Sequence, residues 1–229
     1  MKKELFFNDI TISKEEKASA DKYLFFKGVA KHLEIKELLL SLERDDQLTY
    51  AEIASTYRYD KLIRNVLFRF ISFIEEFYRA AIQDNFSMLS PKALESLKKC
   101  KNKIGDMESI DFECLDFRKL LELIKGLPNK LREKYVFGST ERIAANFTAI
   151  SELRNAVMHN KFLLLTRLGK CYIKDIPSSN LQANVKNLIN YLPSSVKKKC
   201  TDEINLCHKP PKNESDFRWA LAAQLLIVL

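Results

Sequence analysis

The residues best equipped for chemistry in this sequence are an arginine and a histidine five positions apart, Arg154 and His159, with Asn155 between them. Arginine binds phosphate through paired N–H donors, and histidine exchanges protons near neutral pH. Cleavage of RNA by its own 2′-hydroxyl needs a base for that hydroxyl, an acid for the leaving 5′-oxygen and positive charge on the phosphate. We therefore expect Arg154 to hold the scissile phosphate and His159 to act as base, acid or orienting group. Asn155 would bond to His159 or to the phosphate.

Hydrophobic periodicity places Arg154 on the buried side of a helix. Gly138 and the three residues after it predict a helix start. Apolar residues then recur at intervals of four and three, with Arg154 in the same stripe. A charge on such a seam costs free energy unless it is paired or lines a groove. Two interpretations stay open: Arg154 lines a substrate groove, or it pairs with an acid such as Glu75 or Glu76 while His159 caps the helix end.

An ideal helix cannot aim both side chains at one phosphate. Because an α-helix turns about 100° per residue, Arg154 and His159 would lie about 140° apart, whereas Asn155 and His159 share a face. Either the helix distorts near His159, or a second copy of the helix completes the site. A twofold dimer would supply two arginines and two histidines, and the other histidines, His32 and His208, lie outside any comparable cluster. We therefore expect a homodimer with a composite site.

The basic balance of the chain suits a polyanionic partner. The formal net charge is +8 and the isoelectric point is about 9.1, with lysines clustered at 98–103, 125–134 and 197–199. Nucleic acid is the usual partner of such patches, although a solvated, slightly basic surface explains the charge equally well. For an RNA substrate, we expect binding by Lys161, Arg64, Lys98 and Lys99.

No metal or cofactor is expected. The chain has 5 cysteines and no Cys-x-x-Cys pair, so free thiols in a reducing compartment are expected. Cys200, Cys207 and His208 lack a fourth zinc ligand at a suitable spacing. The sequence also lacks a phosphate-cradling glycine loop and a nucleophile elbow, which argues against nucleotide-dependent and acyl-transfer enzymes.

The sequence predicts a soluble, cytoplasmic protein without a membrane partner. Met1-Lys2-Lys3 is followed by Glu4 and by no sustained apolar run, so no secretory signal is expected. The apolar tail 219–229 is shorter than the roughly 20 residues that span a bilayer. We expect that tail to belong to a buried final helix, Asp216 to Leu229.

Long helices should dominate the fold because only 5 glycines and 6 prolines interrupt the chain. The strongest helical periodicity covers residues 60–84. A short helix should precede it, capped by Thr49 with Glu52 three residues on, and Ser90-Pro91 marks a later helix start. Residues 162–176 are ambiguous and could form a small β-hairpin. The remaining helices are expected at 14–42 (as one or two), 112–124, 181–192, 196–207 and 216–229.

Two stretches of the sequence resemble a known group of proteins. Arg154-Asn155 followed by His159 resembles the Arg-x4–6-His motif of HEPN domains, helical proteins many of which are ribonucleases in prokaryotic defence and toxin–antitoxin systems. An earlier stretch resembles the Abi-like (abortive infection) branch, which tends to read Tyr-x-Phe-Asp-x3-Arg and then Ile-Glu-x3-Arg. At matching spacing this chain reads Tyr57-Arg58-Tyr59-Asp60, Arg64, Ile74-Glu75 and Arg79.

The departures from that family pattern lie beside the motif. Asn160 follows His159 where Abi-like proteins commonly continue with a second histidine, and Val157-Met158 replace the usual Cys-Ala. These changes leave Arg154 and His159 intact and bear on fine specificity.

The resemblance implies an all-α fold, a HEPN-like helical bundle forming a single domain over residues 1–229. Its core would cover about residues 57–168, with N-terminal helices in 14–56 and C-terminal helices in 177–229 packed on it. The resemblance further implies a homodimer that cuts RNA without a metal and leaves a 2′,3′-cyclic phosphate. Such a protein would be a growth-arresting toxin, held in check by a protein or RNA antitoxin. Two alternatives stay open: a HEPN-like module that binds RNA or protein without cutting, and a scaffold protein in which Arg154 is buried and fully paired to carboxylates.

Overall fold

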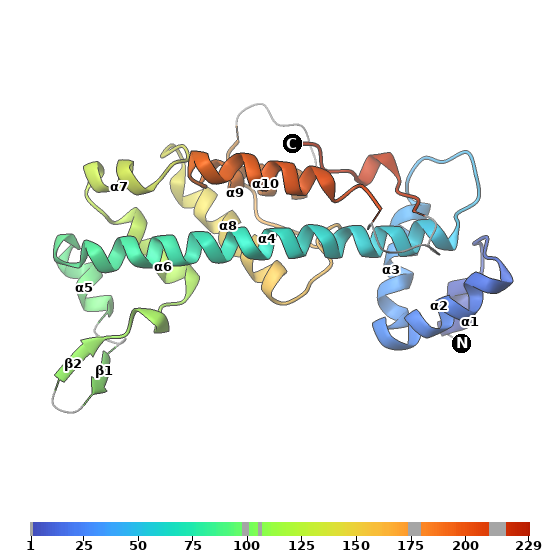
Figure 1. The fold of residues 1–229 in the computed structure, drawn as a ribbon, viewed down its shortest axis with the longest axis horizontal. Helices are drawn as coiled ribbons and strands as arrows, with labels where there is room; N and C mark the ends of the chain where they lie inside the picture. The colour runs from blue at the N-terminus through green and yellow to red at the C-terminus, as the bar shows by residue number, and fades with distance from the viewer. Residues whose placement is uncertain (1, 98–100, 105–106, 174–179, 211–218) are drawn as a thin grey trace.

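One helix of 35 residues, α4 (Tyr50–Asp84), runs along most of the molecule, and most of the other helices pack beside it (Figure 1). The computed structural model describes residues 2–97, 101–104, 107–173, 180–210 and 219–229, and most of them are helical. The all-α fold class predicted from the sequence is confirmed.

Some elements precede α4 in the chain, and the others come after it. Three helices precede it and gather at one of its ends: α1 (Lys2–Phe7), α2 (Lys14–Lys27) and α3 (Val29–Leu40). After it come η1 (Phe86–Met88), α5 (Pro91–Leu97), β1 (Lys101–Ile104), β2 (Met107–Ile110), η3 (Phe112–Cys114), α6 (Phe117–Lys125), α7 (Asn129–Tyr135), α8 (Ile143–Met158), α9 (Asn180–Asn190), α10 (Ser194–Leu206) and η4 (Ala223–Leu225).

The helix ends follow the capping signals in the sequence. Thr49 Oγ1 accepts a hydrogen bond from the Glu52 N–H at 3.3 Å, and the Glu52 carboxylate accepts one from the Thr49 N–H at 2.8 Å. The predicted capping box is therefore confirmed. Ser90 Oγ likewise accepts from the Ala93 N–H at 3.3 Å where α5 begins. Gly28, at φ +86°, separates α2 from α3 because glycine adopts that backbone at little cost.

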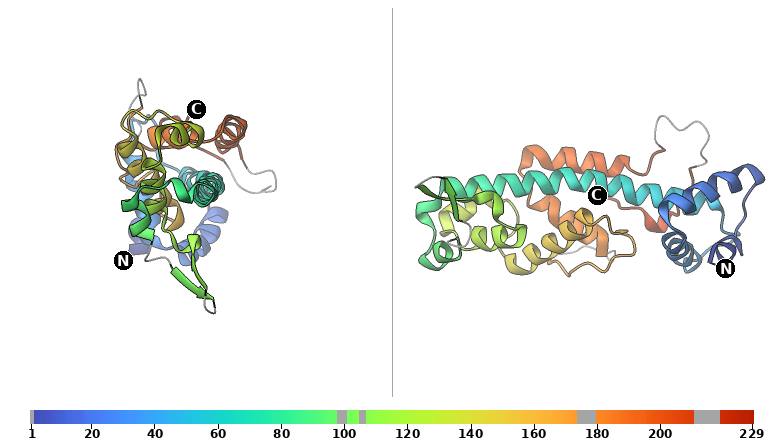
Figure 2. Two further views of the ribbon diagram at one scale, coloured as in Figure 1. Left: turned by 90° about the vertical axis from the view of Figure 1, so that its left-hand side faces the viewer. Right: turned by 90° about the horizontal axis from the view of Figure 1, so that it is seen from below.

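The short helix expected after Thr49 and the helix expected over 60–84 are one continuous helix. Neither glycine nor proline interrupts Tyr50–Asp84, and the packing partners change along its length. Its first turns join a core with α1–α3, and the rest of it packs in a larger core with α6, α8 and α10. Figure 2 shows α6 and α8 along one side of α4 and α10 along another. One helix therefore connects both cores.

The start of α8 is fixed by a buried hydrogen-bond network around Tyr191. The Tyr191 hydroxyl donates to the Ser139 carbonyl at 2.6 Å and accepts from the Asn146 side-chain amide at 3.1 Å. Asn146 Oδ1 accepts from the Tyr172 N–H at 2.7 Å, and the Asn187 side-chain amide donates to the Asn146 carbonyl at 3.0 Å. These bonds connect α8 to α9 and satisfy polar groups whose burial would otherwise cost free energy.

Replacing Gly138 by alanine is expected to lower the free energy of unfolding by about 1–3 kcal/mol, the usual effect of overpacking. A Cβ there would lie 2.8 Å from two atoms of the Tyr191 ring, which is buried and fixed by its hydrogen bonds. Gly169→Ala is the matched control because its Cβ would meet only the flexible end of Glu152. Urea unfolding of both variants checks the prediction, and equal losses of stability would contradict it.

The small β-hairpin that was one possibility for 162–176 does not form over residues 162–173, which are turns and loop without a strand. Residues 174–176 lie outside the described residues. Within the described part of the chain, the one two-stranded sheet pairs β1 with β2 antiparallel, at the end of the molecule opposite α1–α3 (Figure 1). Side chains explain the difference, because Asp60 accepts the N–H groups of Leu163 and Leu164 and so takes the donors that a strand would use.

The final helix expected over Asp216–Leu229 is also wrong where the structure describes the tail. Residues 219–229 are extended apart from the short turn η4. The Ala220 N–H donates to Ser55 Oγ at 2.9 Å, and the Ile227 N–H donates to the Tyr59 hydroxyl at 2.8 Å. Side chains of α4 thus replace the bonds that a helix would make within itself. No helix in the described part of the chain is long and apolar enough to cross a membrane.

Candidate active site

Arg154 lies on the face of α8 that packs toward α4 and α6. Its Nη2 lies 3.5 Å from both carboxylate oxygens of Glu75 on α4, and the same carboxylate lies 3.6 Å from Arg79. The centroid of the Phe117 ring, on α6, lies 5.9 Å from the guanidinium carbon. Arg154 therefore faces neighbouring helices as its periodicity predicted, and Glu75 is one of the two acids considered as its partner.

The pairing of Arg154 is incomplete. Its contacts with Glu75 are at the outer limit of hydrogen-bond distance, and Glu75 also contacts Arg79. The buried Nε of Arg154 has no hydrogen-bond partner among the described residues, and 27% of the side chain is exposed. A purely structural arginine would normally have its buried donors satisfied. The guanidinium thus retains capacity for an anion.

An open groove of about 640 Å³ lies between α6 and α8, and Arg154 and Asn155 are part of its wall. Its volume is within the range of about 300–1,000 Å³ that is usual for ligand sites. Three basic and three acidic side chains line it: Arg118, Lys125, Arg154, Asp116, Glu122 and Glu152. Because these charges cancel over the groove as a whole, the positive charge that would attract an anionic ligand is the local one on the Arg154 guanidinium.

His159 lies where α8 ends. The last helical residue is Met158, and His159 occupies the C-cap position with φ −89° and ψ 13°. Its N–H donates to the Asn155 carbonyl at 3.1 Å, and its imidazole is exposed. His159 is not among the residues that line the groove with Arg154. Within one chain, the two side chains therefore belong to different surfaces, as the helical angle between them predicted.

Asn160, whose backbone is in the left-handed region, turns the chain immediately after His159. Its φ is +52°, a backbone region that asparagine tolerates better than most residues. The Lys161 N–H then donates to the Ala156 carbonyl at 2.9 Å, which is the closing bond of a Schellman motif. This turn sets the direction in which the chain leaves α8.

A buried ion pair on α4 anchors this turn. Arg64 Nε donates to Asp60 Oδ2 at 2.8 Å, and Arg64 Nη1 donates to Asn160 Oδ1 at 3.2 Å. Asp60 Oδ1 accepts the N–H groups of Leu163 and Leu164 at 2.6 and 3.1 Å. Burial raises the pKa of Asp60 to about 6, while the Arg64 charge and the donated bonds act in the opposite direction. Side chains of α4 therefore fix the segment that follows His159.

The stretch that resembles the HEPN motif and the stretch that resembles the Abi-like pattern meet in the folded chain. Asp60 and Arg64 bind the segment after His159, and Glu75 faces Arg154. Sequence separations of 79 to 104 residues divide these partners, so no local spacing could have paired Asp60 or Arg64 with the segment that follows the motif. A single helix thereby contacts both ends of the Arg154-to-His159 stretch.

The residues expected to bind RNA have different surroundings. Arg64 belongs to the buried ion pair, with 10% of its side chain exposed, so its observed contacts are structural. Lys161 is exposed two residues after His159. Lys98 and Lys99 lie outside the described residues.

The other histidines and the C-terminal cysteines do not extend this site. Burial lowers the pKa of His32 and raises the pKa of Cys200 to about 12 and that of Cys207 to about 11, which disfavours reactive thiolates. His208 is exposed near the end of α10. Among the described residues, no three His, Cys, Asp or Glu side chains are grouped so that they could hold a metal ion.

No protein-family model, no curated protein and no solved structure matches this chain. The resemblance to HEPN and Abi-like proteins therefore rests on the motif residues. The features of the structure that bear on function are the groove arginine, the anchored turn and the exposed histidine.

Proposed function

We propose that this protein is a metal-independent endoribonuclease whose active site is formed by Arg154 and His159 of two copies. One arrangement carries the proposal: Arg154 is incompletely paired in an open groove, while His159 is exposed beside a turn that Asp60 and Arg64 immobilise. Phosphoryl chemistry benefits from charge and proton-transfer groups that are already held in place.

Each side chain has a defined role in this proposal. Arg154 donates to the nonbridging phosphate oxygens in place of its long contact with Glu75 and stabilises the charge that develops there. One His159 removes the 2′-hydroxyl proton as the 2′-oxygen bonds to phosphorus. The other His159 protonates the 5′-oxygen as the bond from phosphorus to that oxygen breaks. The products are a 2′,3′-cyclic phosphate and a 5′-hydroxyl end, and Asn155 orients His159 or the phosphate.

A second copy is required because one chain supplies one suitable histidine. His159 does not line the groove that contains Arg154 of its own chain. His32 is buried, and His208 lies near the end of α10. A twofold axis near the end of α8 would place His159 of each copy against Arg154 of the other, since an isologous interface repeats the same patch.

The motif resemblance supports a role in a phage-defence or toxin–antitoxin system. In this proposal the enzyme arrests growth by cutting RNA in the cytoplasm, and a protein or RNA antitoxin holds it inactive. The net charge of +8 suits an RNA substrate. Lys161 is exposed beside the site and would contact the substrate backbone, together with Lys98 and Lys99.

Mixed dimers test the composite site. A heterodimer of wild-type and His159→Ala chains retains both arginines but only one histidine, so it lacks either the base or the acid. We expect this co-expressed heterodimer to cleave single-stranded RNA far more slowly than the wild-type dimer, whereas a site formed within each chain would leave about half of the wild-type rate. Wild-type cleavage should leave 2′,3′-cyclic phosphate ends and persist in EDTA. A heterodimer with about half of the wild-type rate, a monomeric protein that cleaves, or wild-type cleavage abolished by EDTA would each contradict the proposal.

A non-catalytic RNA- or protein-binding module is the second candidate, and the Glu75 contact favours it. A carboxylate 3.5 Å from Arg154 competes with phosphate for the guanidinium. This function predicts RNA affinity that falls steeply with salt, persists in His159→Ala and leaves the RNA intact. Binding measured at two salt concentrations, with a gel to check RNA integrity, separates the two candidates.

A further inference from the structure

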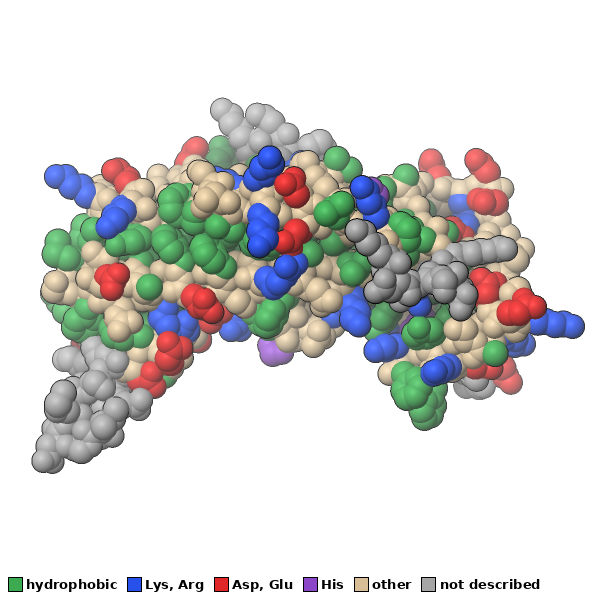
Figure 3. Space-filling view, in the orientation of Figure 1, with side chains coloured by type: hydrophobic (Ala, Val, Ile, Leu, Met, Phe, Trp, Pro, Cys, Tyr) green, Lys and Arg blue, Asp and Glu red, His purple; other side chains and the backbone are tan. Residues whose placement is uncertain are grey.

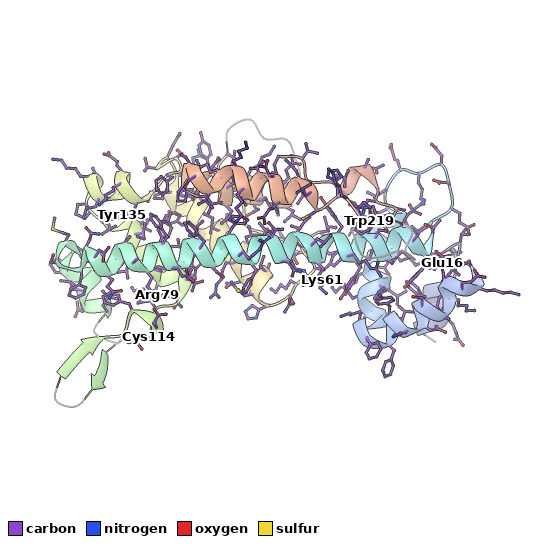
Figure 4. All side chains as sticks on the ribbon, viewed as in Figure 1. Glu16, Lys61, Arg79, Cys114, Tyr135 and Trp219 are labelled. Atoms are coloured by element: carbon purple, nitrogen blue, oxygen red, sulfur yellow. The ribbon has the colours of Figure 1, made fainter. Side chains whose placement is uncertain are left out.

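A second pocket, of about 320 Å³, opens where α2 and α3 meet the N-terminal half of α4. It shares no lining residue with the Arg154 groove. Figure 4 labels Lys61, one of its residues, on the part of α4 toward α1–α3. The pocket is lined by Tyr23, Lys27, His32, Tyr50, Ala54, Tyr57, Arg58, Lys61, Leu62 and Asn65.

Flat, uncharged rings form much of its wall. The His32 ring stacks on the Tyr57 ring, with centroids 5.2 Å apart and planes 6° apart. His32 Nδ1 lies 2.9 Å from the Gly28 carbonyl oxygen, and burial lowers the pKa of His32, which favours the neutral ring. Tyr23 and Tyr50 add two further rings. Such a wall suits a planar ligand group that stacks.

The charged side chains that line the pocket are all basic. Lys27, Arg58 and Lys61 lie around it, and no carboxylate of the described residues lines it. Arg58 lies over the Tyr23 ring, 5.5 Å from its centroid, and donates to the Tyr23 hydroxyl at 3.1 Å. Both lysines are exposed. Aromatic rings combined with positive charge bind the base and the phosphate of a nucleotide together.

A neighbouring hollow of about 420 Å³ shares Tyr23 and Lys27 with the pocket and is also lined by Lys22 and Phe26. Phe26 is 66% exposed and Phe25 is 82% exposed, and their rings meet edge to face at 5.3 Å. Figure 3 shows hydrophobic side chains beside lysines and arginines at the end of the molecule that α1–α3 form. Adjacent aromatic rings this exposed indicate a binding surface.

This surface borders the segment that follows His159. The Tyr57 ring centroid lies 6.3 Å from that of Phe162, three residues after His159. Asn65 lines the pocket and is adjacent in sequence to Arg64, whose guanidinium binds Asn160. A ligand strand that leaves the pocket beside Tyr57 would therefore approach the turn that carries His159.

We propose that the pocket and the neighbouring hollow bind single-stranded RNA, with one base stacked in the pocket and an adjacent base on Phe26. Lys27 and Lys61 would neutralise the flanking phosphates. The inference rests on the proposed function for the identity of the polymer and adds a docking site for the substrate strand outside the cleavage site. Double-stranded RNA fits less well because its bases are already stacked within the duplex. Binding by stacking also tolerates any base sequence.

Binding of a fluorescent 2′-O-methyl oligouridine tests this site without cleavage, because the 2′-hydroxyl nucleophile is blocked. Tyr23→Ala and Phe26→Ala are each expected to raise Kd about 5- to 100-fold, the effect of losing one stacked base. The paired change Lys27→Ala with Lys61→Ala should reduce the slope of log Kd against log salt by about 1.4, as expected for two phosphate contacts on a single strand.

Matched controls remove similar groups from other surfaces. Phe68→Ala removes a half-exposed ring on α4, and Lys198→Ala with Lys199→Ala removes two exposed lysines of α10. Weaker binding confined to the pocket variants, with unchanged thermal unfolding, supports the docking site. Two results would overturn it. One is the same Kd for the pocket variants and the control variants. The other is a duplex that binds as tightly as the single strand, with a Kd that Tyr23→Ala does not change.

The His159→Ala protein separates this inference from the proposed function. We expect it to bind the oligouridine as the wild type does, because His159 does not line the pocket. A wild-type protein that binds through the pocket but cleaves no RNA would refute the nuclease alone. Pocket variants that bind and cleave as the wild type does would refute the docking site alone.

Discussion

The His159→Ala variant is expected to cleave single-stranded RNA about 100- to 10,000-fold more slowly than the wild-type protein, the range that loss of general acid–base catalysis produces. The bonds that fix the adjacent turn involve Asn160 and the backbone, and none of them uses the imidazole. Removing the exposed ring should therefore leave the fold intact. The loss should appear in the rate of single-turnover cleavage, measured as RNA ends that carry a 2′,3′-cyclic phosphate.

The controls for this experiment separate proton transfer from charge. His208→Ala removes another exposed histidine and should cleave at the wild-type rate. Arg154→Lys keeps the positive charge but loses the paired N–H donors, so it should still lose most of the activity. Arg154→Ala should fall about 100- to 1,000-fold. Wild-type rates in His159→Ala would assign the cleavage to another site or to a contaminating nuclease.

The position of Arg154 could be predicted from the sequence because helical periodicity reports which face of a helix is buried. The stripe that contains Arg154 required a groove or an acid, and the structure shows both: an open groove and Glu75 at 3.5 Å. The Thr49 capping box was predictable for a similar reason, since its two residues are three positions apart. Local spacing therefore determined the helices and the face on which the candidate site lies.

Contacts between distant parts of the chain could not be predicted in this way. Asp60 and Leu163 are 103 residues apart, and nothing near Asp60 signals that it accepts two loop N–H groups. Arg64 was expected at an RNA surface because of its charge, although it pairs with Asp60 in the interior. The tail 219–229 is apolar enough for a helix, but side chains of α4 bind its N–H groups and keep it extended.

The rings around the second pocket were missed for a different reason. The rings and the basic side chains that line this pocket come from α2, α3 and α4, and no single stretch of sequence contains all of them. The exposure of Phe25 and Phe26 could not be predicted from their residue type, because phenylalanine is usually buried. Exposure of 82% and 66% is a property of the folded surface. Tertiary structure therefore revealed the second pocket, whereas motif and periodicity indicated the first candidate site.

The Asp60→Ala variant is expected to lower the free energy of unfolding by about 3–5 kcal/mol, the usual effect of removing one partner of a buried ion pair. Asp60 is fully buried, and its removal would leave the Arg64 charge and two N–H groups without their acceptor. Amide exchange at Leu163 and Leu164 should accelerate along with the global loss. Asp84→Ala, which removes an exposed carboxylate of α4, should change stability by less than about 0.5 kcal/mol.

The contribution of Asp60 to the free energy of unfolding should depend on pH, and the direction of that dependence follows from its pKa. Burial raises the pKa of Asp60 from the ordinary 3.8 to about 6, so the folded protein keeps this proton to higher pH than the unfolded chain does. The stability contributed by that proton is complete below about pH 4 and is lost as the pH rises through about 6. Asp60→Asn cannot titrate, and its deficit relative to the wild type should shrink across this range. A deficit that grows with pH would mean that the Arg64 charge outweighs burial. Asp60 would then hold the His159 turn as a carboxylate whose pKa is lowered.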